Sequence, residues 1–193
     1  MTAFITRCLK SLSLLLLVAG MGLARADGVE VRRAELELAE HRLQLSTRFQ
    51  TTLPPVLQDA LQQGVPLTFE LQFELTRPRG YAYYYDLKSW FEPTARLEFK
   101  LSYYRFTNRY RLTIGSLSKY YATLDEALSA LGNIAGWAVL DVADWSEADA
   151  RRAQGRVRLA LDTGALPRPF QLGALGDRDW TLSSPWTDVK VRS

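Results

Sequence analysis

Alternation of hydrophobic and polar residues dominates the chain and predicts a sheet with one buried and one solvated face. The clearest example is segment 67–75, where every second residue is apolar: Leu67, Phe69, Leu71, Phe73 and Leu75. Segments 29–49 and 96–114 each alternate on both sides of a polar break, and they predict hairpins that turn near Glu40–His41 and Thr107–Asn108. A one-residue slip of the alternation near Arg33 predicts a β-bulge.

Shorter segments complete a predicted mainly β (α+β) fold. Further strands are expected at 81–85, 137–142, 157–161 and 179–182, and an extended connector at 166–170. Short helices are expected after Leu53, with Gly64 beyond the end, after Ser146, and after the capping box of Thr123 and Glu126. The sum is an antiparallel β-sandwich or a strongly curved sheet with two or three short helices.

The N-terminal segment 1–26 is typical of a cleavable signal peptide. Two basic residues, Arg7 and Lys10, precede the apolar run 11–23, and Ala24 and Ala26 occupy the −3 and −1 positions of a cleavage site. Cleavage after Ala26 would leave residues 27–193 as a single β-rich domain in the periplasm. The apolar run falls short of the roughly 20 residues of a membrane-spanning helix, and no other stretch of the chain comes close. An uncleaved N-terminal anchor is the alternative.

Net charge disfavours one class of partner, and the cysteine content excludes a disulfide in the predicted mature chain. Three of the 24 basic residues lie in segment 1–26, so the predicted mature chain has 21 basic and 21 acidic residues and no net charge. A neutral chain has no general attraction to nucleic acid, which disfavours that class of partner. The only cysteine, Cys8, also lies in the leader, so the mature domain is cysteine-free and has no disulfide.

No motif for catalysis, for a metal or for a cofactor is recognisable, so none is predicted. The single histidine, His41, lies at an expected hairpin turn, where a solvated side chain is far more common than a catalytic one. An acidic cluster near the predicted third helix does not fit the calcium-binding loop pattern, and acids at the start of a short helix complement its dipole. The cluster comprises Asp141, Asp144, Glu147 and Asp149.

Basic residues gather in segment 77–119, which holds nine Lys or Arg against three acids. Strand parity puts five side chains on the solvated face of the second hairpin. They are the candidate binding residues: Arg96, Lys100, Tyr104, Arg109 and Arg111. Such a face suits an envelope protein, an anionic lipid or an acidic glycan. The alternative is an ordinary solvated face, paired in part with the acidic segment 125–149.

Several segments together resemble a family of proteobacterial exported proteins catalogued only as a domain of unknown function. They are GVPL (64–67), LSYYRFTNRYRL (101–112), TLDEAL (123–128), VRLALD (157–162) and DWTLSSPW (179–186). The resemblance brings no catalytic residues. Because such proteins are often encoded beside a sensor kinase of the nitrogen-regulation type, it implies an accessory role linked to envelope signalling.

The predicted function is therefore that of an exported, non-catalytic binding or accessory module. Two alternatives stay open at this point. A small outer-membrane β-barrel fits the length and the alternating strands, although two capped helices within the chain disfavour it. An enzyme of unrecognised type would have to use His41 and scattered carboxylates, which nothing in the sequence brings together.

Overall fold

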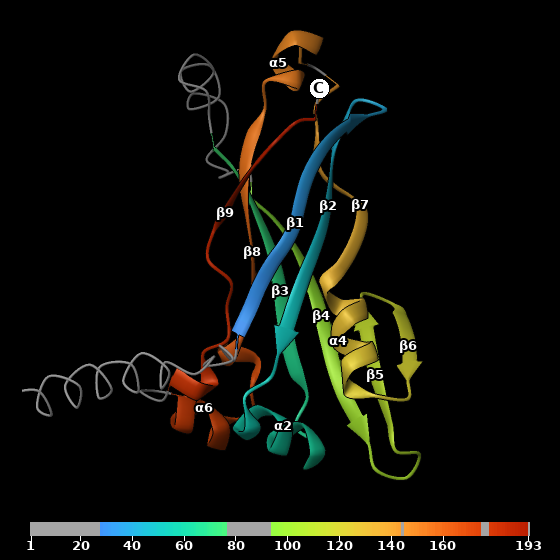
Figure 1. Cartoon of the computed structure of the whole chain (residues 1–193), viewed down its shortest axis with the longest axis vertical. Coiled ribbons are helices and arrows are strands. Elements are labelled where there is room, and N and C mark those ends of the chain that lie inside the picture. The colour runs from blue at the N-terminus through green and yellow to red at the C-terminus, as the bar shows by residue number, and fades with distance from the viewer. Residues whose placement is uncertain (1–27, 77–93, 144, 175–177, 193) are drawn as a thin grey trace, which may run out of the picture.

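Two antiparallel sheets form the body of the protein in the computed structural model, which describes residues 28–76, 94–143, 145–174 and 178–192 (Figure 1). The smaller sheet has the order β1 (Gly28–Ala39), β2 (Arg42–Thr52), β7 (Asn133–Asp141). The larger sheet has the order β6 (Leu117–Tyr121), β5 (Arg109–Ile114), β4 (Thr94–Tyr104), β3 (Leu67–Leu75), β8 (Gln154–Leu161), β9 (Thr187–Lys190). The predicted mainly β, sandwich-like fold is confirmed.

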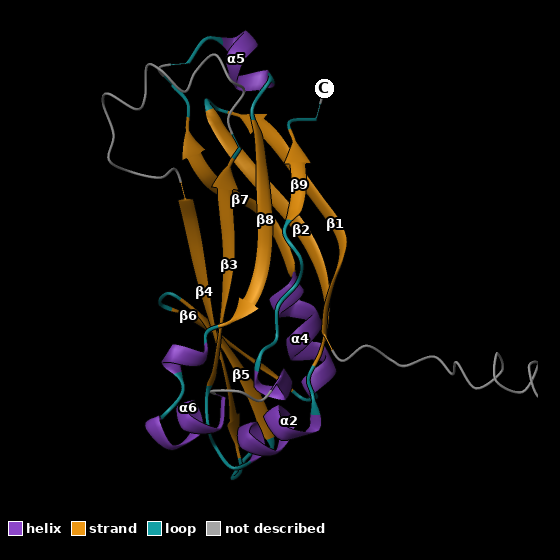
Figure 2. Cartoon of the chain, turned by 90° about the vertical axis from the view of Figure 1, so that its left-hand side faces the viewer, coloured by secondary structure: helices purple, strands orange, loops and turns teal. Residues whose placement is uncertain are grey.

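Short helices gather at the ends and sides of the sheets (Figure 2). The four described α-helices are α2 (Pro55–Gln62), α4 (Leu124–Gly132), α5 (Glu147–Arg151) and α6 (Arg168–Ala174). Two 3-10 turns, η1 (Thr163–Ala165) and η2 (Arg178–Trp180), flank α6. Of the helices in the described part of the chain, none is long and apolar enough to cross a bilayer.

The first hairpin and the β3 strand follow the sequence pattern closely. Glu40 and His41 form the two-residue turn between β1 and β2, with φ angles of 50° and 58°. Two left-handed residues are what a type I′ turn requires, and this turn matches the twist of the flanking strands. The pairing register shifts between Val31 and Arg33, which confirms the predicted bulge. Strand β3 covers 67–75 as expected.

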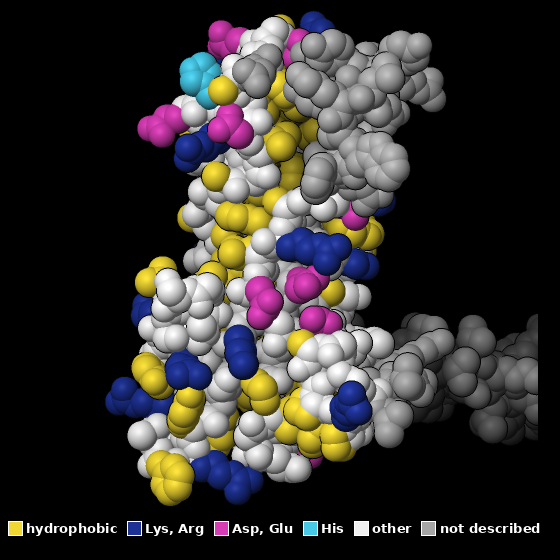
Figure 3. All heavy atoms as spheres, turned by 180° about the vertical axis from the view of Figure 1, so that it is seen from behind, with side chains coloured by type: hydrophobic (Ala, Val, Ile, Leu, Met, Phe, Trp, Pro, Cys, Tyr) yellow, Lys and Arg dark blue, Asp and Glu magenta, His cyan; other side chains and the backbone are white. Residues whose placement is uncertain are grey.

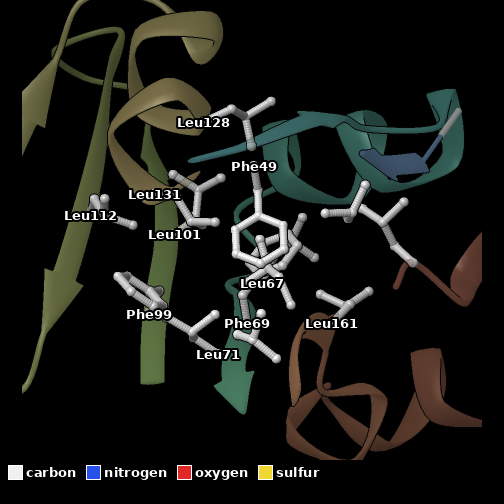
Figure 4. Close-up of a cluster of buried hydrophobic side chains, with 14 of the residues drawn as sticks. Phe49, Leu67, Phe69, Leu71, Phe99, Leu101, Leu112, Leu128, Leu131 and Leu161 are labelled. Carbon is white, nitrogen blue, oxygen red and sulfur yellow. The ribbon is translucent and has the colours of Figure 1, made fainter. Parts of the chain in front are cut away.

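The core lies between the two sheets, where the inward-facing residues of β2, β3 and β4 meet (Figure 4). Phe49 of β2 points toward Leu67 of β3, and Leu131 of α4 closes the cluster on one side. Leu67, Phe69 and Phe99 are fully buried. The alternation predicted from the sequence therefore places the apolar residues of both sheets in one shared interior.

The C-terminal strand joins the two sheets along one side. Strand β9 pairs with β8 of the larger sheet, and the chain then reaches β1 of the smaller sheet. Leu36 and Val191 form an isolated parallel bridge, and the backbone N–H of Arg192 donates to the carbonyl of Leu36 over 2.8 Å. Since β1 is an edge strand, this contact satisfies part of its free edge.

The C-terminal region departs from the sequence predictions. Segment 166–170 is not an extended connector: helix α6 begins at Arg168, and the carbonyl of Pro167 accepts from Phe170 at 2.9 Å. Proline suits a first helical turn, where no backbone donor is needed. The predicted strand at 179–182 is also wrong, because Trp180 ends a 3-10 turn and packs against Phe170 at 5.7 Å between ring centroids.

Strand β6 was not predicted. It follows β5 through the two-residue turn Gly115–Ser116, and Gly115 has a φ of 56°. Three other predictions concern residues outside the described part of the chain: the signal peptide, the strand at 81–85 and the acid Asp144.

Candidate binding surface

Strand register places four of the five predicted binding residues close together on the outer face of the larger sheet. Tyr104 of β4 lies opposite Arg109 of β5, while the inward-facing pair Leu101 and Leu112, farther along the two strands, is buried. Tyr120 of β6 lies opposite Arg111 on the same face. We call this surface the three-strand face; it comprises Lys100, Tyr104, Arg109, Arg111 and Tyr120. Figure 3 shows basic and hydrophobic side chains intermixed over the end of the molecule that these strands occupy.

Arg111 is the structural centre of the three-strand face. Its guanidinium carbon lies 4.9 Å from the ring centroid of Tyr104, a cation–π contact. The ring of Tyr104 meets that of Tyr120 edge-on at 6.1 Å. Arg111 is half-buried, and its Nε is enclosed without a hydrogen-bond partner among the described residues. The cation therefore supports the ring of Tyr104, which in turn contacts Tyr120, and it is less accessible than Arg109, which is exposed.

A shallow hollow lies beside these rings. Its volume is about 570 Å³, and it is lined by Tyr104, Thr107, Arg109 and Tyr120. Each of these residues carries a hydrogen-bond donor in its side chain, although most of the surface that lines the hollow is apolar. Guanidinium and hydroxyl donors suit an anionic oxygen ligand such as a carboxylate or a phosphate.

Arg96 lies apart from the other four residues. Eight positions of strand separate it from Tyr104, which corresponds to roughly 27 Å. It faces Gln72 of β3 in the central part of the sheet. There the outer face carries a ladder of charged and amide groups, in which the Nε of Arg156 donates to Glu74 over 2.7 Å and Arg158 donates to Gln72. Geometry thus associates Arg96 with this ladder, and its role in binding stays a prediction.

The acidic segment does not neutralise the three-strand face. Helix α4, where the segment begins, packs on the inner side of β5 and β6 (Figure 4). Burial raises the pKa of Tyr110, an inner-face residue whose ring lies tilted against that of Tyr103, and the charges of Tyr103 and of Asp125 in α4 raise it further. Within the described residues, no carboxylate forms an ion pair with Lys100, Arg109 or Arg111.

Other basic residues of the predicted cluster have different positions. The Nε of Arg105 donates to the carbonyl of Gln62 over 3.0 Å and so ties the β4–β5 turn to the end of α2. Lys119 lies on the inner side of β6, with its Nζ 5.5 Å from the ring centroid of Tyr121. The remaining three members, Arg77, Arg79 and Lys88, lie outside the described residues.

Two aromatic members of this region were missed from the sequence. Tyr120 was missed because β6 was not recognised, although the Gly–Ser pair at 115–116 between two alternating segments is a hairpin signal. Phe106, in the β4–β5 turn, is fully exposed, at 104% of its reference area. Strand alternation says nothing about the exposure of a phenylalanine in a turn, so only the structure reveals that no described residue covers it.

The residues considered for catalysis or metal binding do not form a centre in the structure. His41 is exposed in the β1–β2 turn and lines none of the hollows described in this section. Glu147 pairs with Arg151, and the Oδ1 of Asp141 accepts the backbone N–H of Ala143. Across the described ranges, no three His, Cys, Asp or Glu side chains are grouped as a metal site would require.

Two other hollows lie along the smaller sheet. One, of about 550 Å³, lies between β2 and α4 and contains Arg48 and Asp125 in its lining. The second, of about 780 Å³, follows β1 from Gly28 to Ala34 and borders the first described residue. Each lining holds two arginines together with a carboxylate, and Arg32, which lines both hollows, pairs with Glu30 over 2.8 Å. The two hollows therefore give less indication of an anionic ligand than the three-strand face does.

Comparison with known proteins gives a family and nothing more specific. No curated protein and no solved structure matches the chain significantly. A family model described as a domain of unknown function, DUF4390, matches residues 26–190. This match covers nearly all of the chain after the predicted leader, and it agrees with the resemblance seen in the sequence. The chain therefore belongs to the DUF4390 family, whose function is unknown.

Proposed function

We propose that this protein is an exported, non-catalytic binding or accessory module of the cell envelope, and that the three-strand face is its contact surface. The export signal, the absence of a recognisable catalytic motif in the sequence and the family match are compatible with this role. The partner is anionic: an acidic protein, an acidic glycan or a lipid headgroup.

One observation supports this proposal above the others. Lys100 and Arg109 are exposed on a sheet face where, among the described residues, no carboxylate pairs with them. Segment 94–123 holds six basic residues and one acid, Glu98, although the chain without its leader has no net charge. A local excess of one sign on a neutral protein attracts partners of the opposite sign to that region.

The test is a charge reversal confined to exposed positions. Arg111 is left intact because its half-buried side chain supports Tyr104, and reversing it would disturb the fold. The double variant Lys100→Glu/Arg109→Glu is compared with the wild type and with Arg42→Glu, which reverses an exposed arginine in the first hairpin of the smaller sheet. Each tagged protein is purified from gently solubilised envelopes, and its co-purifying proteins and lipids are quantified.

We expect the wild type and Arg42→Glu to retain a stoichiometric partner and the double variant to lose at least nine-tenths of it, since rim charges steer and stabilise such contacts. If all three proteins recover the same amount of partner, the three-strand face is not the contact surface. Export is tested separately by sequencing the N-terminus of the periplasmic protein. Asp27 as the first residue is the expected result, whereas a retained leader would support the N-terminal anchor.

A further inference from the structure

We infer that the β4–β5 tip docks on an anionic phospholipid bilayer, with Phe106 entering the headgroup boundary and a lipid phosphate occupying the hollow beside Arg109. This inference rests on the proposed function and specifies its ligand. The tip comprises Tyr104, Phe106, Thr107, Arg109 and Tyr120.

Exposed hydrophobic area is the first argument. Among the described residues, all the large hydrophobic side chains that remain exposed belong to β4–β6 and their turns: Tyr104, Phe106, Leu117 and Tyr120. Three of them gather at the tip, whereas Leu117 lies at the other end of β5. Aromatic side chains beside polar groups are typical of residues that anchor proteins at a membrane interface.

Charge is the second argument. Arg109 lines the same hollow as the two tyrosines, and Lys100 lies four positions back along β4 on the same face. Basic groups near a surface rich in anionic lipid each strengthen its attraction, and the effect fades within a Debye length. Thr107 and the two tyrosines also line this hollow, and their side chains carry hydroxyl groups of the kind that can donate to phosphate oxygens, although most of the lining surface is apolar.

Shape favours a bilayer over a protein partner. The β4–β5 turn projects at one end of the long axis of the molecule (Figure 1). Phe106 stands fully exposed at this end and lines none of the three hollows described above. A stable protein interface needs about 800 Å² of complementary surface on each partner. Insertion of one ring between lipid headgroups requires no complementary pocket, so an exposed tip is sufficient.

The experiment measures binding of the exported protein, as purified from cells, to two kinds of vesicle. One kind is pure phosphatidylcholine and the other contains phosphatidylglycerol in addition. Wild type and two single variants, Phe106→Ala and Arg109→Gln, are compared by co-sedimentation at low and high salt. Leu117→Ala removes an apolar side chain that is 75% exposed away from the tip, so it is the matched control for Phe106.

We expect binding to the anionic vesicles only, weakened by salt. Phe106→Ala should reduce the affinity about ten-fold or more, from the apolar area it removes. Arg109→Gln should reduce it about five-fold, as expected for one basic group at an anionic surface. Leu117→Ala should bind like the wild type. In Phe106→Trp, which keeps a ring at the tip, the added tryptophan emission should shift to the blue on vesicle binding.

Three results would overturn the inference. They are absence of binding to phosphatidylglycerol vesicles, binding that Phe106→Ala and Leu117→Ala reduce equally, and saturation by soluble glycerol phosphate with no gain from the bilayer. Such a failure differs from failure of the proposed function. Suppose that the protein does not bind vesicles, but that an envelope protein co-purifies with the wild type and not with Lys100→Glu/Arg109→Glu. The three-strand face is then the contact surface, and its ligand is a protein.

Discussion

Gly132, the last residue of α4, packs against the backbone of β2 so closely that a single added methyl group should destabilise the protein. A Cβ built at this position would lie 2.2 Å from the carbonyl oxygen of Phe49 and 3.0 Å from its carbonyl carbon. Non-bonded carbon and oxygen atoms do not approach so closely, and the atoms in the way belong to backbone in the middle of a sheet. In Gly132→Ala, therefore, either α4 or β2 must move.

The expected magnitude follows from two opposing effects. In a helix without such a contact, Gly→Ala stabilises by about 0.5–1 kcal/mol because alanine loses less backbone entropy on folding. Here α4 must withdraw by roughly 1 Å to restore van der Waals separation, which loosens Leu128 and Leu131 in the core. Overpacking of this kind costs about 1–3 kcal/mol. We expect a net loss of about 1–2 kcal/mol, opposite in sign to the effect of helix propensity.

Urea unfolding followed by circular dichroism measures this loss as a lower midpoint at an unchanged slope. Ser129→Ala is the control, since it makes a small change at an exposed position of the same helix and should alter stability by no more than about 0.5 kcal/mol. A Gly132→Ala protein as stable as the wild type, or more stable, would refute the reasoning and would mean that α4 lies farther from β2.

Two further predictions concern α4 and the sheet beneath it. Thr123→Ala should lower the free energy of unfolding in urea by about 1 kcal/mol. The Oγ1 of Thr123 accepts the backbone N–H of Glu126 over 3.2 Å, and the Glu126 carboxylate accepts the backbone N–H of Thr123. An unchanged urea midpoint would contradict this prediction. Burial raises the pKa of Tyr110 above its ordinary 10.0, so the folded state holds this proton more tightly and stability should fall as pH rises above about 10. Tyr110→Phe should reduce that alkaline loss, and an identical pH profile would count against it.

Local patterns in the sequence were sufficient to predict those features that depend only on residues close together in the chain. Period-two alternation placed Phe69 and its neighbours inside, and the polar pair Glu40–His41 marked the first turn. The capping box of Thr123 and Glu126 located the start of α4. In each case the interacting groups, or the alternating positions of a strand, lie within a few consecutive residues. The sequence alone is therefore enough to recognise them.

Pairing between distant segments required the tertiary structure. Alternation assigned Lys100, Tyr104, Arg109 and Arg111 to one face, because the β4–β5 hairpin connects them directly. It also grouped Arg96 with them, since parity specifies a face and not a distance along the strand. Only the structure showed that Arg96 faces Gln72 of β3, and that Arg156 and Arg158 of β8 extend this central ladder.

The same distinction explains the errors at the C-terminus and the residues that were missed at the candidate surface. Prolines at 167 and 169 are compatible with an extended connector and with a first helical turn, and the packing of Phe170 on Trp180 accompanies the helix. The exposure of Phe106 depends on what the rest of the chain leaves uncovered. The sequence by itself therefore determined which residues face inward and where turns and caps occur. The tertiary structure decided which strands are neighbours and which side chains remain in solvent, because these depend on contacts between residues far apart in the chain.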